Sequence, residues 1–445
     1  MQSSKIESLF ALRIVVYIAQ QIAANAVRQV LAGKNLTLAL PEAQQRFAKA
    51  TPQQRGAGAD LSYGTLRFYG ELQYFLQQLL DKPLSDSHVQ ALLLVALYQL
   101  CHDKADDFTV VNQAVKAASN AKPAWAKGLV NGVLRNFLRQ KELLTTQVAQ
   151  QEDATYSYPQ WWIDTLKAQY PQDWQAMLLV GNTHPPMTLR VNQRKISTED
   201  YMQLLDRHGI AAQQVGPCAV ILQQPMAVDS IPGFADGVVS VQDMGAQLAP
   251  YLLDLAPHLR VLDACCAPGG KTGHLLESAD IDLTAIDNDA ARLSRVTSNL
   301  TRLSLQANLK VGSAANLANW YDGQMFDRIL ADVPCSASGI VRRHVDIKWL
   351  RREADIVSFT QQQSAILLNL WQILAKGGKL LYVTCSVFEH ENQRQIDAFL
   401  SQHADAKQLP IQLEANLGQH VQWLNGQLIP SALHDGLFYA LLQKV

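Results

Sequence analysis

Two cysteines lie in short motifs that suit covalent chemistry. Asp332-Val-Pro-Cys335-Ser and Thr384-Cys385-Ser each follow an apolar run typical of a strand. A thiolate that adds to C6 of a cytosine ring converts C5 into an enamine carbon, which can attack an electrophilic methyl group. The ring also needs a proton or hydrogen bond at N3, which a carboxyl group such as Asp332 can supply, and a base for the C5 proton. Two thiols and one acid match these requirements.

A third motif, DACCAPGGKT over residues 263–272, runs from a predicted strand through a tight turn into a helix. Glycines allow close backbone approach, and a helix N-terminus offers N–H groups to an anion. A P-loop needs a glycine where Cys265 stands, and the G-x-G-x-x-G fingerprint is absent. Asp287 ends the next predicted strand, where an acid accepts hydrogen bonds from ribose hydroxyls. This pairing indicates a nucleoside-bearing cofactor.

The segments that must position these motifs alternate between strands and helices. Apolar strands are predicted over 260–265, 283–287, 308–311, 328–332 and 379–384, with helices such as 290–303 and 358–374 between them. This alternation predicts a parallel, doubly wound Rossmann-like α/β sheet. Because ligands bind outside the carboxyl ends of such strands, we expect both thiols and Asp332 to share one crevice with the cofactor.

The rest of the chain divides into two further parts. Helical spacing of apolar residues and sparse Gly/Pro predict an all-α region before residue 140, and residues 142–160 are polar and Gln-rich like a linker. A helical piece over 161–180 and a strand over 187–192 follow. We therefore predict a multidomain chain with a helical domain over 1–142, a linker and small connecting α/β domain over 143–235, and a doubly wound domain over 236–445.

Composition excludes several classes of protein. The chain has 445 residues, of which 48% are apolar and 17% charged, so it is not disordered. The longest apolar run, 91–98, is far shorter than the ~20 residues of a membrane span. Six cysteines without a Cys-x-x-Cys pair disfavour zinc and disulfide frameworks, so we expect no metal. The start lacks a signal-peptide core, which predicts a cytoplasmic protein without a membrane partner.

Charge is distributed unevenly. Residues 1–140 contain 15 Lys/Arg and 9 Asp/Glu, whereas the whole chain has a net charge of −1. A stretch over 108–141 contains six basic residues and no acid. Nucleic-acid backbones bind such stretches, but a solvated helix face has the same pattern and charge alone favours it. The basic residues are Lys116, Lys122, Lys127, Arg135, Arg139 and Lys141.

Taken together, the three motifs resemble the RNA cytosine-5 methyltransferases that use S-adenosylmethionine, in order and spacing across residues 187–445. The first 140 residues resemble the NusB fold, an RNA-binding helical domain, through YGTLR at 63–67 and VNGVLRN at 130–136. This domain order is similar to that of the RsmB (Fmu/Sun) family. The resemblance implies methylation of C5 of a cytosine in 16S small-subunit ribosomal RNA, either naked or in a partly assembled subunit. Nothing in the sequence demands more than a monomer, which is therefore the expected state.

The resemblance also implies roles for individual residues. Cys385 would be the nucleophile on C6, as in the RNA enzymes, whereas DNA cytosine-5 enzymes attack with the Pro-Cys thiol. Cys335 would assist loss of the C5 proton, and Asp332 would contact both cytosine and cofactor. Asp287 would hold the ribose. The methionine part of the cofactor would be held by Cys265, Cys266, Ala267, Pro268, Gly269, Gly270 and Lys271.

One family feature is missing. The family's second cofactor acid follows a glycine after the third strand, and here the pair is Gly312-Ser313, with Asn316 nearby as a substitute. Binding of RNA raises the expectation that the basic stretch contacts phosphates. The residues expected to bind RNA are Lys116, Lys122, Lys127, Arg135, Arg139, Arg190, Arg342, Arg343 and Lys348.

Two alternatives explain part of the sequence. An NAD-dependent oxidoreductase on the same sheet would account for the glycine loop and Asp287 but would leave both strand-end thiols idle. A non-catalytic RNA-binding assembly factor would account for the basic stretch and the change at Ser313. It would not need the two cysteines and Asp332. Methylation of another RNA is a third alternative.

Overall fold

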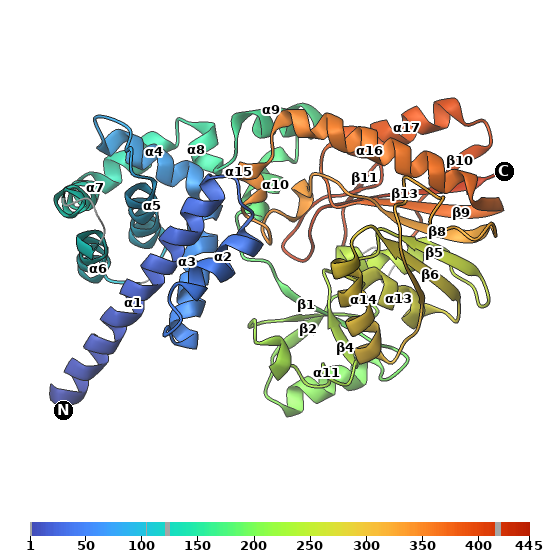
Figure 1. The fold of residues 1–445 in the computed structure, drawn as a ribbon, viewed down its shortest axis with the longest axis horizontal. Coiled ribbons are helices and arrows are strands. Elements are labelled where there is room, and N and C mark those ends of the chain that lie inside the picture. Colours follow the sequence, from blue (N-terminus) through green and yellow to red (C-terminus); the bar gives the residue numbers. More distant parts are fainter. Residues whose placement is uncertain (1, 104, 121–124, 414–419) are drawn as a thin grey trace. The chain divides into compact units, whose positions relative to one another are not determined.

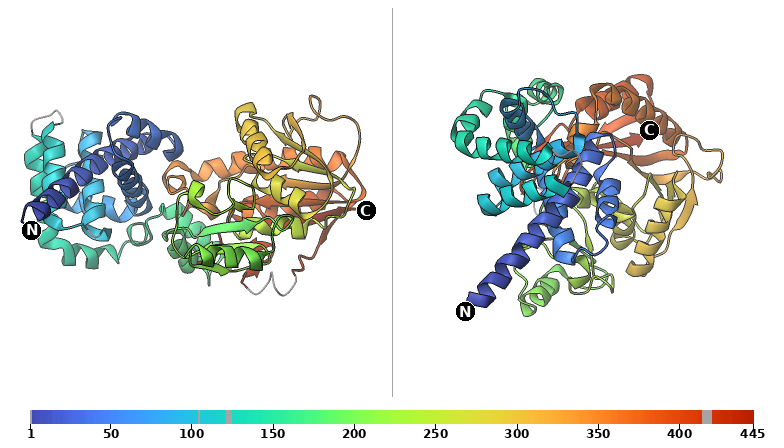
Figure 2. Two further views of the ribbon diagram at one scale, coloured as in Figure 1. Left: turned by 90° about the horizontal axis from the view of Figure 1, so that it is seen from below. Right: turned by 60° about the vertical axis from the view of Figure 1, so that its left-hand side comes forward.

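The computed structural model describes residues 2–103, 105–120, 125–413 and 420–445. The chain forms two compact units, each built from two separate stretches of sequence (Figures 1 and 2). Unit 1 combines residues 1–183 with 341–352, and unit 2 combines residues 184–340 with 353–445. In the described residues, none of the helices is long and apolar enough to cross a membrane.

Unit 1 is helical, as predicted, and α5 (Ser87–His102) forms its centre. Every residue of α5 from 91 to 100 is buried, because its apolar residues surround the helix on all sides. Thr51 and Gln54 form a capping box that fixes the start of α3 (Pro52–Arg67). The remaining long helices are α1 (Gln2–Leu31), α2 (Leu36–Gln45), α4 (Tyr69–Leu79), α6 (Asp107–Asn120), α7 (Ala126–Val148), α9 (Gln160–Gln169) and α10 (Trp174–Gly181).

Residues 341–352 belong to this helical unit although they lie far along the chain. The segment contains α15 (Ile347–Leu350), and Val345 is fully buried in the helical core. Asp346 Oδ2 accepts a hydrogen bond from the Leu36 N–H at 2.9 Å, and Trp349 Nε1 donates to the Leu66 carbonyl at 2.7 Å. The segment therefore forms an integral part of the core of unit 1.

The predicted linker over 142–160 is wrong as a structural description. Helix α7 continues to Val148, and a short helix α8 (Glu152–Tyr156) follows. Leu144 and Tyr158 are each 2% exposed, so a few well-spaced apolar residues hold this polar stretch in place. The predicted helix over 161–180 is divided into α9 and α10 around Pro171, which cannot continue a helix.

The smaller sheet of unit 2 is antiparallel, with strand order β2-β3-β1-β4. β1 (Met187–Val191) matches the predicted strand and pairs with both β3 (Ala219–Leu222) and β4 (Val239–Val241). β2 (Ala212–Gln214) forms the edge, and the amphipathic helix α11 (Thr198–Arg207) packs its buried Tyr201 and Leu205 on the core of this sheet. β4 lies beyond residue 235, so the small sheet includes a strand from the segment predicted to form the doubly wound domain.

The larger sheet has the order β11-β12-β13-β9-β8-β5-β6-β7, with β10 beside β13. Its parallel part matches the five predicted strands, which are β5 (Arg260–Ala264), β6 (Asp282–Asp287), β7 (Asn308–Val311), β8 (Phe326–Asp332) and β9 (Leu374–Thr384). The sheet is mixed because β13 (Leu437–Lys444) pairs antiparallel with β9. The short strands at this side are β10 (Ala406–Leu409), β11 (Trp423–Leu424) and β12 (Gln427–Leu428).

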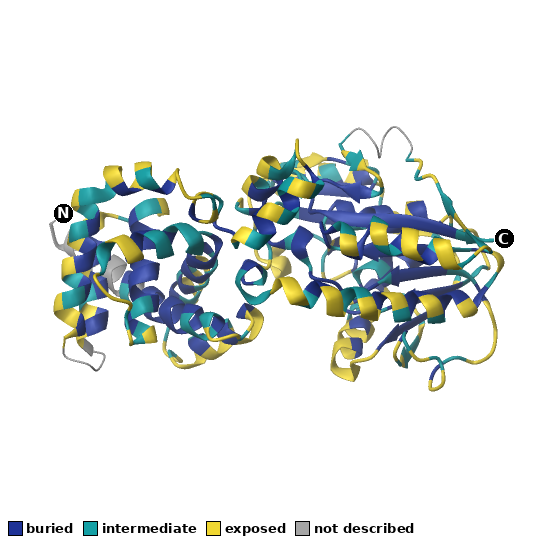
Figure 3. Cartoon of the chain, turned by 90° about the horizontal axis from the view of Figure 1, so that it is seen from above, coloured by how far each residue is buried: buried dark blue, intermediate teal, exposed yellow. Residues whose placement is uncertain are grey.

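Helices cover both faces of the large sheet, which leaves most residues of β5, β6, β8, β9 and β13 buried (Figure 3). α13 (Gly270–Ser278) and α14 (Ala290–Leu303) pack on one face with α12 (Ala249–Leu252), and α16 (Glu353–Gln372) and α17 (Gln393–Gln402) pack on the other. From β5 the chain proceeds outward through β6 to β7, then returns to β8 on the other side of β5. This reversal opens a ligand-binding crevice at the carboxyl ends of β5 and β8.

Candidate active site

A cavity of about 220 Å³ lies at this reversal, and the three sequence motifs meet around it. Asp287 and Asp332 reach it from the ends of β6 and β8, and the two predicted catalytic thiols line it as well. The structure therefore brings Cys265, Asp287, Asp332, Cys335 and Cys385 together around one cavity, as the strand pattern predicted. The lining of the cavity also includes Ala267, Asn288, Arg292, Ser313 and Gln362.

The loop after β5 approaches the cavity with its backbone. Cys265 has φ +63° and Gly269, directly before α13, has φ +95°. A Cβ on Gly269 would lie 3.1 Å from Val296 Cγ1, so both the backbone conformation and the close packing require glycine. Burial raises the pKa of Cys265 to about 12. Cys265 is therefore a neutral thiol that shapes the loop.

Asp287 is fixed by the same loop. Its Oδ2 accepts the Ala267 N–H at 3.2 Å, and its Oδ1 accepts the Asp289 N–H at 3.0 Å. Arg292 Nη2 lies 3.5 Å from Asp287 Oδ2 and donates to the Ala267 carbonyl at 3.0 Å. The side chain of Asp287 is only 2% exposed and lines the cavity. Its carboxylate is thereby oriented toward a ligand.

Asp332 forms an ion pair with Lys271. Lys271 Nζ lies 2.7 Å from Asp332 Oδ2. Burial alone would lower the pKa of Lys271, but the charge and hydrogen bond of Asp332 outweigh this effect and raise it. Lys271 is therefore a cation at neutral pH, and the pair offers one hydrogen-bond donor and one acceptor at the carboxyl end of β8.

The two predicted catalytic thiols face each other. Cys335 Sγ lies 3.4 Å from Cys385 Sγ, within hydrogen-bonding distance for sulfur. Cys335 is 9% exposed, whereas Cys385 is more open. The hydrogen bond with Cys385, together with burial, raises the pKa of Cys335 well above its usual value. Cys335 therefore retains its proton.

Ser313 lines the cavity at the position where the resemblance leads us to expect an acid. Its Oγ accepts the Ala315 N–H at 3.2 Å. Asn316, the expected substitute, uses its Oδ1 to accept the Ala318 N–H at 3.1 Å. Both side chains thus stabilise the turn after β7.

The set of polar groups around the cavity fits a cofactor that carries a nucleoside and an amino acid. Carboxylates suit ribose hydroxyls and an ammonium group, and Asp287 and Asp332 supply one at each side of the strand reversal. The N-terminus of α13, preceded by Gly269, suits a carboxylate. These residues match the demands of S-adenosylmethionine.

Comparison with known proteins agrees with this arrangement. The model of the 16S rRNA methyltransferase RsmB/F family matches residues 250–443, that of its ferredoxin-like domain residues 158–229, and that of the NusB family residues 17–139. Ribosomal RNA small subunit methyltransferase B of Pseudomonas putida (strain KT2440) is 44% identical over 95% of this chain and 98% of its own. The chain belongs to the RsmB/F methyltransferase family.

Other relatives extend this result. The protein of the same name from Serratia proteamaculans is 41% identical over 96% of this chain and 99% of its own. The crystal structure of PH0851 has the same fold, with a TM-score of 0.78, 24% identity and coverage of 96% of this chain and 99% of that one. Like its family, this RsmB/F protein uses S-adenosylmethionine, which excludes the oxidoreductase alternative.

Arg190 is not available for phosphate, which corrects one expectation. Its side chain is fully buried and forms a bidentate ion pair with Glu277, with distances of 2.8 Å and 2.7 Å. Arg190 Nη1 also donates to the Gly270 carbonyl at 2.7 Å and to Gln242 Oε1 at 2.6 Å. Arg190 therefore supports both ends of α13 from β1.

Arg342 and Lys348 are also misassigned as phosphate contacts. Arg342 is 2% exposed, and Lys348 is fully buried within unit 1. Lys348 Nζ donates to the Arg67 carbonyl at 2.7 Å and to Asn182 Oδ1 at 2.8 Å. Burial lowers the pKa of Lys348 well below its usual value. Arg343 is partly exposed and stays a prediction.

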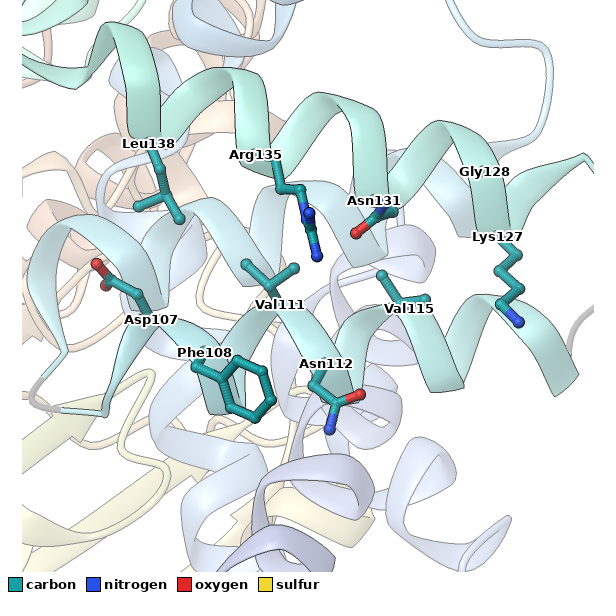
Figure 4. A pocket seen from close by; sticks show the side chains of 10 residues that line it. All are labelled: Asp107, Phe108, Val111, Asn112, Val115, Lys127, Gly128, Asn131, Arg135 and Leu138. Atoms are coloured by element: carbon teal, nitrogen blue, oxygen red, sulfur yellow. The ribbon is translucent and has the colours of Figure 1, made fainter.

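The basic stretch of unit 1 forms a surface on α6 and α7. Lys116, Lys127, Arg135 and Arg139 are exposed there, and Lys122 lies outside the described residues. A cavity of about 640 Å³ lies between these two helices, and two of the four exposed cations, Lys127 and Arg135, line it (Figure 4). We call this cavity the α6–α7 groove; its lining residues are Asp107, Phe108, Val111, Asn112, Val115, Lys127, Gly128, Asn131, Arg135 and Leu138.

Sequence reasoning missed several residues that shape the active site. Arg292 and Gln362 line the cavity, and Glu391 hydrogen-bonds to the residues that follow both cysteines. Arg292 is five residues after Asp287, a spacing that could have suggested an ion pair across the start of α14. A single acid or glutamine in a loop or helix has no comparable pattern.

Proposed function

We propose that this protein methylates C5 of a cytosine in 16S small-subunit ribosomal RNA through a covalent bond between Cys385 and C6. The main support is the pair of strand-end thiols, 3.4 Å apart beside a cavity that also contains Asp287 and Asp332. The choice of RNA rests on relatives named ribosomal RNA small subunit methyltransferase B, which match nearly the whole chain. A monomer suffices, since one chain supplies every residue of this site.

When bound, S-adenosylmethionine supplies an electrophilic methyl group. Cys385 is the better nucleophile because it is the more open thiol, while Cys335 retains its proton. Attack of the Cys385 thiolate on C6 makes a carbon–sulfur bond and moves the ring electrons toward N3 and C5. After C5 gains the methyl group, removal of its proton restores the C5–C6 double bond and releases Cys385.

The ion pair of Asp332 and Lys271 orients the cytosine ring and stabilises the negative charge that develops on it. The carboxylate accepts a hydrogen bond from the exocyclic amino group, and the ammonium group donates toward the ring atoms that gain negative charge. Once Cys385 is bonded to C6, it no longer holds the Cys335 proton through its charge and hydrogen bond. Cys335 then releases that proton to solvent, and the resulting thiolate accepts the C5 proton. Asp287 holds the cofactor ribose.

The α6–α7 groove contacts RNA outside the active site. Lys127 and Arg135 suit phosphates, and Asn112 and Asn131 offer amide groups to base edges. Phe108 is 67% exposed at this groove, as a platform for stacking an unpaired base requires. Lys116 and Arg139 extend the positive surface along both helices.

Covalent trapping tests this function. Wild type, Cys335→Ala and Cys385→Ala are incubated with S-adenosylmethionine and small-subunit ribosomal RNA, then run on a denaturing gel. We expect a protein–RNA adduct to accumulate in Cys335→Ala, where release is blocked, and methyl transfer to stop in Cys385→Ala. An adduct that accumulates only in Cys385→Ala would reverse the two roles. Absence of both adduct and methyl transfer in all three would reject the proposed substrate or the enzyme itself.

A further inference from the structure

Glu391 is a buried carboxylate beside the active site. It is fully buried in the short 3₁₀ turn Glu389–Glu391, which follows the Thr-Cys-Ser motif. Its donors are all uncharged: one backbone N–H, two hydroxyls and one side-chain amide. A carboxylate is costly to bury unless hydrogen bonds replace its lost water, so Glu391 needs these four donors to stay in place around it.

The hydrogen bonds of Glu391 join the two cysteine loops. Its Oε2 accepts from Ser336 Oγ and from Ser386 Oγ, both at 2.5 Å. Its Oε1 accepts from the Ser336 N–H at 2.8 Å and from Gln363 Nε2 at 3.1 Å. Ser336 directly follows Cys335, and Ser386 directly follows Cys385. One carboxylate therefore contacts the neighbour of each thiol.

The paired part of β8 and β9 ends before both cysteines. Beyond it, the Gly339 N–H donates to the Cys385 carbonyl at 2.8 Å and Ser338 Oγ lies 2.9 Å from Ser386 Oγ, and Glu391 adds a charged acceptor to these links. Hydrogen bonds to a charged acceptor are about twice as strong as those between neutral groups. Gln363, from α16, also donates to the Pro334 carbonyl at 2.9 Å, which fixes the first loop to the same cluster.

We propose that Glu391 is a positioning residue that holds the loops bearing Cys335 and Cys385 at the separation that covalent catalysis requires. This inference rests on the proposed function only in assuming that both thiols act on the substrate. The spacing of the thiols is a property of the protein alone, so it can be measured without RNA.

Oxidative cross-linking measures this spacing. Diamide takes two electrons and two protons from two neighbouring thiols, which become a disulfide, and mass spectrometry after digestion quantifies the Cys335–Cys385 peptide pair. We compare wild type with Glu391→Gln, which keeps the size but loses one acceptor oxygen. Glu389→Gln is the matched control, because it makes the same change two residues away, where Glu389 pairs with Arg394 at 3.2 Å.

We expect Glu391→Gln to cross-link roughly tenfold more slowly and to lose roughly tenfold in kcat, with KM for S-adenosylmethionine within twofold of wild type. Glu389→Gln should match wild type in both measurements. Wild-type cross-linking and kcat in folded Glu391→Gln would overturn the inference. If that variant does not fold, Ser336→Ala and Ser386→Ala each remove one hydroxyl from the carboxylate and should slow cross-linking in the same direction.

The outcomes separate this inference from the proposed function. If even wild type does not methylate ribosomal RNA, the cross-linking result still decides whether Glu391 sets the spacing of the thiols. If wild type methylates through Cys385 and Glu391→Gln cross-links normally, the function stands and the role of Glu391 is rejected.

Discussion

Lys271 Nζ lies 2.7 Å from Asp332 Oδ2, so the cofactor loop and the end of β8 are joined by an ion pair inside the active site. Lys271 comes from the first turn of α13, directly after the glycines, and Asp332 ends the strand that leads to Cys335. A ligand that enters between these elements meets both charges together. In the proposed mechanism, this pairing links the residues that hold the cofactor to those that contact the cytosine.

Replacing Lys271 by Met should reduce the single-turnover rate of methyl transfer by about 100-fold or more, since the ring loses its cationic hydrogen-bond donor. Lys271→Arg should retain more activity, because it keeps the charge. Rapid-quench measurement with saturating RNA and cofactor gives the rate. A Lys271→Met rate within threefold of wild type would exclude a role in the chemical step.

Asp263 should make stability depend on pH. It is fully buried, Thr272 Oγ donates to its Oδ2 at 2.7 Å, and burial raises its pKa to about 7. The folded state therefore holds a proton that the unfolded state, with a pKa near 3.9, releases earlier. This contribution to stability is complete below about pH 4 and is lost as the pH rises to about 7.

Urea unfolding of wild type and Asp263→Asn across this pH range tests the effect. Because the asparagine does not titrate, the free energy of unfolding of wild type relative to the variant should fall as the pH rises from about 4 to about 7. Parallel curves for the two proteins would show that Asp263 has an ordinary pKa in the folded state.

Removing the cations of the α6–α7 groove should weaken RNA binding and reduce its salt dependence. In Lys127→Ala/Arg135→Ala, the slope of log affinity against log salt should decrease in magnitude by about 0.7 for each phosphate that the protein no longer neutralises. Lys49→Ala, an exposed cation outside the groove, is the control. Filter binding at several salt concentrations measures the slope. Equal slopes for both variants would place the RNA elsewhere.

Lys348 should stabilise the helical unit without contributing to RNA affinity. Lys348→Ala removes two buried hydrogen bonds and the packing of the side chain under Tyr158, whose ring centroid lies 4.3 Å from Nζ. We expect a loss of about 2–4 kcal/mol in the free energy of unfolding, and an unchanged salt slope for RNA binding. A reduced salt slope with normal stability would restore Lys348 to the RNA-binding surface.

The sequence allowed the positions of short-range features to be predicted, and the structure explains why others escaped prediction. Strands such as β7 and helices such as α14 follow from local periodicity, and the strand ends then place Asp287, Cys335 and Cys385 around one cavity. The antiparallel β13 was missed because strand direction depends on pairing with β9, which one strand's own pattern does not encode.

The main error of the sequence-based predictions was to place buried charged residues on the RNA-binding surface. Arg190 is of a residue type that usually lies on the surface, yet its partner Glu277 lies 87 positions away, so their ion pair exists only in the folded chain. Lys348 differs from a surface lysine only because Arg67 and Asn182 supply buried oxygen atoms at two distant points. A local sequence window contains neither partner.

The placement of residues 341–352 in the helical unit has a consequence for synthesis of the protein. The first 183 residues leave the ribosome early, but Val345 and Lys348, which fill buried positions among them, are made about 160 residues later. At about 5–20 residues per second, this delay is roughly 10 to 30 seconds. The N-terminal helices therefore complete their packing only after β5 to β8 have been translated, so the folding of unit 1 overlaps with the synthesis of unit 2.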